Sequence, residues 1–145
     1  MTSFNEKYLG HASFAPVYAE LNRRKAIVYV HPRTPDCCRN IVSEMPASGV
    51  EYTTDTTRTI GSLVFSGTAA RYPDVRWIFS HSGGKGALDA LRALAPPSQI
   101  LFGTDYPMRP AQEEVDALAA YGFESADLQA IDRENVLRLI PRLKA

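Results

Sequence analysis

Cysteine is scarce in this 145-residue chain, which has only Cys37 and Cys38, next to each other. Neighbouring cysteines are poorly placed for an ordinary disulfide, because bridged cysteines usually have Cα atoms at least about 4.4 Å apart. We therefore expect two free thiols, as is typical of the reducing cytoplasm. The alternative is that Cys37 is an activated nucleophile, although its local sequence supplies no partner base.

An excess of either charge is also absent, because 16 Lys and Arg balance 16 Asp and Glu. Without a basic patch, the chain has no electrostatic signature of nucleic-acid or anionic-membrane binding. Apolar runs are short, as at 26–30, whereas a membrane span needs about 20 residues. The first residues also lack the pattern of a secretory signal. With 45% hydrophobic residues, the composition predicts a cytoplasmic globular domain with no nucleic acid and no membrane partner.

Strand and helix patterns alternate along the chain. Apolar stretches at 26–30, 75–80 and 99–102 predict strands of the kind found inside parallel sheets. Helical spacing predicts intervening and following helices near 16–21, 54–70, 87–94 and 115–121, and a set of shorter helices over 125–140. This order favours an α/β fold with parallel strands and right-handed crossovers.

The second of these helices carries several polar residues of interest. Thr54 or Asp55 is expected to cap its first turn. Arg58 is expected to form an ion pair with Asp55, and is a weak candidate for binding a substrate carboxylate. The side chains expected to face the core are Ile60, Leu63, Val64, Gly67 and Ala70.

Three chemistry-bearing side chains follow the three predicted strands. They are His31, His81 and Asp105, and they follow 26–30, 75–80 and 99–102 respectively. Any one of them alone is more often a turn or capping residue than a ligand. Because the carboxyl ends of parallel strands meet at one edge of the sheet, we expect all three to share a site. Two imidazoles and a carboxylate suit zinc, iron or manganese. His11 is expected to be an exposed loop residue.

Gly83 and Gly84 join a predicted strand to a predicted helix, as phosphate-binding turns do. The turn lacks both the G-x-G-x-x-G pattern and a G-K-[ST] ending, so tight packing beside His81 is the favoured explanation. A doubly wound nucleotide-binding module has only this turn in its favour.

The strand-end motifs together resemble the later half of the metal-dependent amidohydrolase superfamily, in the branch of aminocarboxymuconate-semialdehyde and gamma-resorcylate decarboxylases. They are VHP at 30–32, FSHSGG at 79–84 and ILFGTDYP at 100–107, with DTTR at 55–58 and DRENV at 132–136. The resemblance implies a (β/α)₈ barrel with a divalent metal, zinc or manganese, at its C-terminal face. It implies that His31 and Asp105 are metal ligands and that His81 is the catalytic acid and base.

Two features of the family pattern are missing. The family's first strand carries a His-x-His pair of metal ligands, and this sequence has no such pair. Between Gly84 and Ala87, the family carries the rest of a helix and a strand, where this chain has two residues. A complete barrel takes about 250 residues. Residues 1–145 are therefore expected to form a single truncated amidohydrolase-related domain, a partial TIM barrel of roughly three strand–helix units with C-terminal helices.

Two functions follow from this resemblance. One is that of a metal-dependent decarboxylase (a lyase) or hydrolase that acts on a small carboxylated substrate, aromatic acids included. The alternative is a non-catalytic remnant or subunit that associates with a partner supplying the missing half-barrel. A partial barrel leaves strand edges unpaired, which predicts a homo-oligomer or a partner chain.

Overall fold

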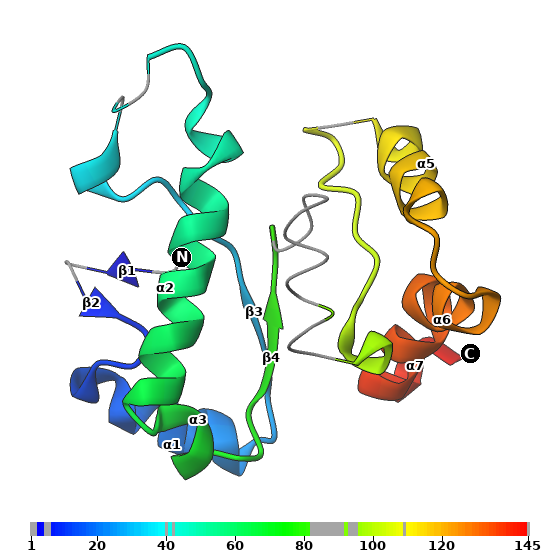
Figure 1. Cartoon of the computed structure of the whole chain (residues 1–145). Helices are drawn as coiled ribbons and strands as arrows, with labels where there is room; N and C mark the ends of the chain where they lie inside the picture. Colours follow the sequence, from blue (N-terminus) through cyan, green and yellow to red (C-terminus); the bar gives the residue numbers. More distant parts are fainter. Residues whose placement is uncertain are drawn as a thin grey trace. The chain divides into compact units, whose positions relative to one another are not determined.

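The computed structural model of the chain describes residues 3–4, 7–39, 41, 43–81, 92, 96–108 and 110–144. These residues belong to two compact units, Met1–Gly83 and Gly84–Ala145. Figure 1 shows the elements of both units, and each unit is described by itself. The turn at Gly83 and Gly84 lies outside the described residues, as does the predicted helix over 87–94 except for Arg92, which is helical.

The first unit is built on a parallel strand pair. Strands β3 (Ile27–Val30) and β4 (Arg76–Phe79) pair in parallel, with Val30 opposite Phe79. The pairing extends past β4, where the Ser80 amide donates to the Val30 carbonyl at 3.1 Å. Two of the three predicted strands are thus formed, in the predicted parallel orientation.

Helix α2 (Glu51–Phe65) runs along this strand pair, and Gly67 at φ 72° separates it from α3 (Thr68–Arg71) (Figure 1). The predicted cap is wrong, because the helix begins at Glu51. The predicted apolar stripe is confirmed only at Leu63, which is 2% exposed, and is wrong at Ile60 and Val64, which are 38% and 58% exposed. The side chains that α2 buries are Asp55, Thr56, Thr59 and Leu63. Hydrogen bonding explains this polar face: Thr56 Oγ1 donates to the Ser80 carbonyl at 3.2 Å, which ties the helix to the end of β4.

Short elements complete the first unit. The two-residue strands β1 (Ser3–Phe4) and β2 (Lys7–Tyr8) pair antiparallel, and α1 (Ala15–Arg23) follows a 3-10 turn at Ala12–Phe14. The segment between β3 and α2 contains 3-10 turns at Asp36–Cys38 and Ala47–Gly49, in agreement with the long loop expected there. The buried apolar side chains of this unit are Tyr18, Val30, Leu63 and Val75.

The second unit consists of helices packed on an extended segment. Its described elements are a 3-10 turn at Pro97–Gln99, α5 (Ala111–Tyr121), α6 (Ser125–Gln129), a π-helical turn at Ala130–Glu134, α7 (Asn135–Leu139) and a 3-10 turn at Pro141–Lys144. Ile100 and Ile131 form its buried core. Helix α5 ends at Gly122, whose φ of 90° suits glycine.

The third predicted strand, at 99–102, is not assigned as a strand among the described residues. Instead, its backbone is satisfied by the helices: the Phe102 amide donates to the Ile131 carbonyl at 3.2 Å, and Asn135 Nδ2 donates to the Ile100 carbonyl at 2.7 Å. The set of shorter helices predicted over 125–140 is formed by α6, the π-helical turn and α7, which follow one another without an interruption.

Within the described part of the chain, no helix combines the length and the apolar character needed to cross a bilayer.

Candidate functional site

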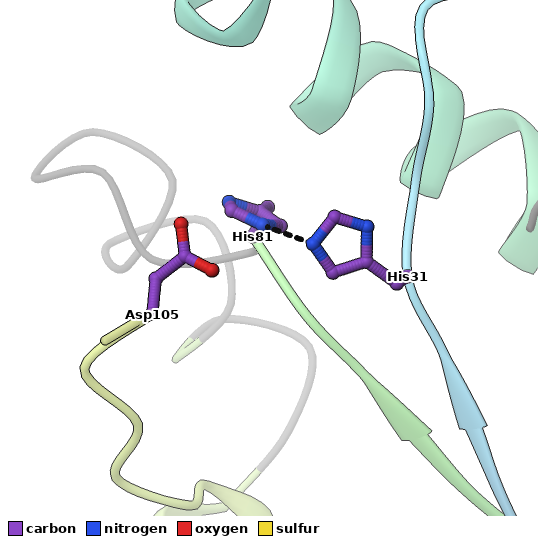
Figure 2. Close-up of side chains that lie close together, drawn as sticks. All are labelled: His31, His81 and Asp105. Atoms are coloured by element: carbon purple, nitrogen blue, oxygen red, sulfur yellow. Dashed lines mark hydrogen bonds between the residues drawn. The ribbon is translucent and has the colours of Figure 1, made fainter. Parts of the chain in front are cut away.

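The structure brings two of the predicted site residues together. His31 directly follows β3, and His81 follows β4 after one residue. Their Nε2 atoms lie 3.0 Å apart, and the rings meet edge to face, with centroids 4.7 Å apart at 88° (Figure 2). Parallel pairing of β3 and β4 causes this meeting, because it places both strand ends at the same edge.

The hydrogen bonds of His31 fix which nitrogen carries its proton. Nδ1 lies 2.7 Å from the carbonyl oxygen of Pro32. A carbonyl only accepts, so Nδ1 must be the donor, and in the neutral ring Nε2 then holds a lone pair. That lone pair faces His81 Nε2, which must carry the proton shared between the rings. His81 is therefore the proton donor of the pair.

The backbone of His81 is held in a conformation that non-glycine residues rarely adopt, with φ at 59°. Thr53 Oγ1 on α2 donates to the His81 carbonyl at 3.4 Å. One residue earlier, the Ser80 hydroxyl donates to the Val30 carbonyl at 3.1 Å. These contacts hold the turn on both sides. Backbone strain of this kind persists where the surrounding structure holds it in place, and such residues cluster at functional sites.

Tyr52 is a site residue that the sequence reasoning missed. Its ring centroid lies 6.0 Å from that of His31 and 5.2 Å from that of His81, both at 73°. It belongs to the first turn of α2 and precedes the buried Asp55 and Thr56 by three and four residues. This helical spacing of inward-facing polar residues is the signal that would have found it.

Asp55 is the most enclosed charged group of the first unit, with no exposed surface. Its Oδ1 accepts a hydrogen bond from the Tyr8 hydroxyl at 2.9 Å, and its Oδ2 lies 3.5 Å from the Arg33 amide. Burial, followed by the hydrogen bond to Asp55, raises the pKa of Tyr8. The carboxylate thus joins β2 to the segment that leaves His31.

Arg58 is exposed and does not form the ion pair expected with Asp55. Hydrogen bonds to Tyr8 and then to Cys38 raise the pKa of its guanidinium. A role in binding a substrate carboxylate stays a prediction. His11 is exposed, as expected, and its Nδ1 accepts from the Ser13 amide at 3.1 Å.

Asp105 belongs to the second unit, and Figure 2 draws its side chain as well. It is exposed, its φ is 55°, and its carbonyl accepts from the Met108 amide at 2.9 Å, which closes a turn. The turn presents the carboxylate directly after the extended segment that packs on Ile131. Its membership of a site shared with the two histidines stays a prediction.

His31 has the chemistry that a divalent metal requires. The hydrogen bond from Nδ1 to the Pro32 carbonyl orients the His31 ring and directs the Nε2 lone pair away from the backbone.

Comparison with known proteins identifies the family. A family model described as Amidohydrolase matches residues 1–87, more than half of the chain and the part that contains both histidines. The chain belongs to the amidohydrolase family. The resemblance inferred from the strand-end motifs is thereby confirmed.

Curated relatives of this amidohydrolase-family chain include two fungal decarboxylases. The 6-methylsalicylic acid decarboxylase acuB of Aspergillus aculeatus is 30% identical over 193 residues, which cover 94% of this chain and 57% of that protein. Decarboxylase macB of Penicillium terrestre is 28% identical over 190 residues, covering 94% and 56%. The chain thus spans a little over half the length of these relatives.

The alignment with acuB also bears on the expected internal deletion. Since 94% of 145 residues is about 136, roughly 57 of the 193 aligned positions have no counterpart in this chain. This supports a gap within the aligned span, as expected from the family pattern. The place predicted for it, between Gly84 and Ala87, lies outside the described residues.

A solved structure described as an amidohydrolase II matches the chain with a TM-score of 0.83 at 24% identity, covering 97% of this chain and 60% of that protein. This likeness shows the fold, which is that of part of a (β/α)₈ barrel. Amidohydrolase-family proteins generally use a divalent metal, which agrees with the donor chemistry of His31.

Proposed function

We propose that this chain carries part of a metal-dependent decarboxylase site for a small aromatic carboxylic acid, with His81 as the proton donor. The observation that carries this proposal is the arrangement of hydrogen-bond donors and acceptors around the histidine pair. The contact of His31 Nδ1 with the Pro32 carbonyl supports a proton on that nitrogen, and this in turn supports a proton on His81 Nε2. That nitrogen is the one that the family resemblance makes the catalytic acid and base.

The choice of decarboxylation over hydrolysis rests on the relatives. Both acuB and macB are decarboxylases, and the substrate in the name of acuB is 6-methylsalicylic acid. The histidine pair by itself suits either reaction, because both need a proton moved at near-neutral pH. An aromatic acid is therefore the substrate class that we assign.

The reaction would proceed by proton transfer to the ring. His81 Nε2 gives its proton to the ring carbon that bears the carboxylate, the bond from that carbon to the carboxylate breaks, and CO₂ leaves. The electron pair of the broken bond stays on the ring and restores its aromaticity. Thr53 and Ser80 keep His81 in the position from which it donates, and Tyr52 restricts the movement of both imidazoles.

His31 and Asp105 are the residues that we propose to hold the metal, zinc or manganese. A bound divalent ion supplies Lewis-acid chemistry that holds substrate oxygens and withdraws electron density from the reacting group. His31 is suited to this role by the fixed tautomer described above, and Asp105 by its exposed carboxylate. Arg58 remains the weak candidate for the substrate carboxylate.

The proposal is tested by separating the two histidine roles. We expect the purified chain to bind zinc weakly and below one ion per chain after dialysis, because protein zinc sites generally use three or four ligands. His31→Asn should lose both this zinc and any release of CO₂ from 6-methylsalicylate. His81→Asn should lose CO₂ release while keeping the zinc.

His11→Asn is the matched control, because His11 is an exposed histidine outside the pair, and it should change neither measurement. Equal loss of zinc in His31→Asn and His81→Asn would make His81 a ligand and contradict its assignment as the proton donor. One tightly held ion per chain would show ligands beyond His31 and Asp105. Circular dichroism checks that each variant folds.

A second candidate function is association with a partner that supplies the rest of the barrel. The observation that favours it is the ligand set, since the sequence has three histidines and none of them forms a His-x-His pair. Light scattering tests this candidate: a complex or oligomer supports it, whereas a monodisperse, cooperatively melting monomer contradicts it.

A further inference from the structure

Cys37 and Cys38 form a compact pair of thiols that the proposed function does not use. Both are free and lie in the 3-10 turn Asp36–Cys38, on the segment between β3 and α2. Their Sγ atoms are 2.7 Å apart, so the two side chains point the same way from neighbouring residues. Cys37 is exposed and Cys38 is half-buried, so reagents in solution can reach the pair.

The surroundings make the two sulfurs unequal. The hydrogen bond to Cys38 is the first cause that raises the pKa of Cys37. Either thiol can donate in the contact between the two sulfurs. The Arg58 guanidinium hydrogen bonds to Cys38, and its charge also acts on Cys37. Because the pKa of Cys37 is raised, we assign Cys38 as the sulfur that attacks and Cys37 as the one that follows.

We propose that Cys37 and Cys38 are a reversible redox site that closes into a vicinal disulfide when hydrogen peroxide oxidises it. The Cys38 thiolate attacks the peroxide oxygen, the O–O bond breaks, and water leaves after protonation, which gives a sulfenic acid on Cys38. The Cys37 sulfur then attacks the Cys38 sulfur, the S–O bond breaks, and a second water leaves. The peroxide takes up two electrons and the two thiols lose them.

The geometry also predicts that the disulfide is easily reduced. Cα atoms of neighbouring residues are about 3.8 Å apart, which is shorter than the 4.4–6.8 Å usual for bridged cysteines. A bridge across one peptide bond therefore stores strain, and strained disulfides are the labile ones. The dithiol is accordingly the resting form, and oxidation is a reversible modification. This inference does not depend on the proposed decarboxylase activity.

The test is peroxide treatment of the full chain followed by thiol titration and peptide mass analysis. Because the chain has only these two cysteines, the thiol count should fall from two to none, and a thiol reductant should restore both. Trypsin should release a peptide over 34–39 that contains both sulfurs, lighter by about 2 Da for the two lost hydrogens. The whole protein should remain the same size on a non-reducing gel.

Three variants separate the roles. Cys37→Ser should stop at a sulfenic acid or be oxidised further, because no second sulfur follows. Cys38→Ser should react several-fold more slowly with peroxide, because the attacking sulfur is gone. Arg58→Gln should slow the reaction of the intact pair but still yield the bridged peptide. A peptide that gains only oxygen in the unmodified chain, or a disulfide found only between chains, would overturn the proposal.

Discussion

Replacing Tyr8 with phenylalanine tests whether the buried Asp55 carboxylate organises the first unit. Asp55 has no exposed surface, and the Tyr8 hydroxyl is its short hydrogen-bond donor, at 2.9 Å. The other contact, from the Arg33 amide, is long at 3.5 Å. Tyr8→Phe removes one oxygen atom and leaves Oδ1 buried without that donor. The change therefore isolates the hydrogen bond with little loss of packing.

A hydrogen bond to a charged group contributes about 1.5–3 kcal/mol, so we expect Tyr8→Phe to lower the free energy of unfolding by about 2 kcal/mol. With a urea m-value of about 1–3 kcal/mol per molar, the midpoint should fall by about 1 M. The single tryptophan, Trp77, lies in β4 and reports the unfolding of this unit by fluorescence. Tyr29→Phe is the matched control, since that tyrosine is 61% exposed, and it should change the midpoint little.

A double-mutant cycle with Asp55→Asn measures the coupling directly. If the hydroxyl acts through the carboxylate, Tyr8→Phe should cost about 1 kcal/mol less in the Asp55→Asn background, because contacting residues are not additive. The reasoning is refuted if Tyr8→Phe and Tyr29→Phe have the same midpoint. It is also refuted if the two changes at Tyr8 and Asp55 are simply additive.

Three further predictions follow from individual positions. Gly10→Ala should destabilise the chain by about 1–3 kcal/mol, because a Cβ there would lie 2.1 Å from the Ser62 carbonyl oxygen. Gly61→Ala, inside α2, should stabilise it by about 0.5–1 kcal/mol, because a Cβ there would lie 4.0 Å from the Phe65 ring, and urea titration compares the two variants. Asn135→Asp should destabilise the second unit by about 1–3 kcal/mol, because a carboxylate would replace the amide that donates to two backbone carbonyls at 2.7 and 2.8 Å. Faster amide hydrogen exchange in α7 should reveal this loss of stability. Burial raises the pKa of Tyr18 to about 12 from 10.0, so the folded state holds this proton more tightly than the unfolded state does. The free energy of unfolding should therefore fall as pH rises from 10 to about 12. If the free energy of unfolding of Tyr18→Phe fell by the same amount over this range, the assignment to Tyr18 would be contradicted.

Much of the secondary structure was readable from the sequence, because apolar period and turn chemistry are local properties. The strands at 27–30 and 76–79 and the helix that ends at Gly122 were predicted in this way. The inward face of α2 was not, because its residues are threonines and an aspartate rather than an apolar stripe. Their burial depends on carbonyls and hydroxyls from β2 and β4, which lie 24 to 47 residues away in the chain.

The sequence by itself determined that His31 and His81 follow parallel strands. This position predicted the edge of the sheet at which the two histidines meet, and the motifs around them carried the family resemblance. Tertiary structure decided which groups the two histidines contact there. The ring of His81 lies against that of His31, and the contacts of Thr53 and Ser80 hold the left-handed backbone of His81. It likewise decided that the segment at 100–102 bonds to helices rather than to a strand. The physical reason is that the spacing of residues along the chain determines which face of a helix or strand each one occupies. The hydrogen-bond partners of a side chain from distant segments are determined only when those segments pack together.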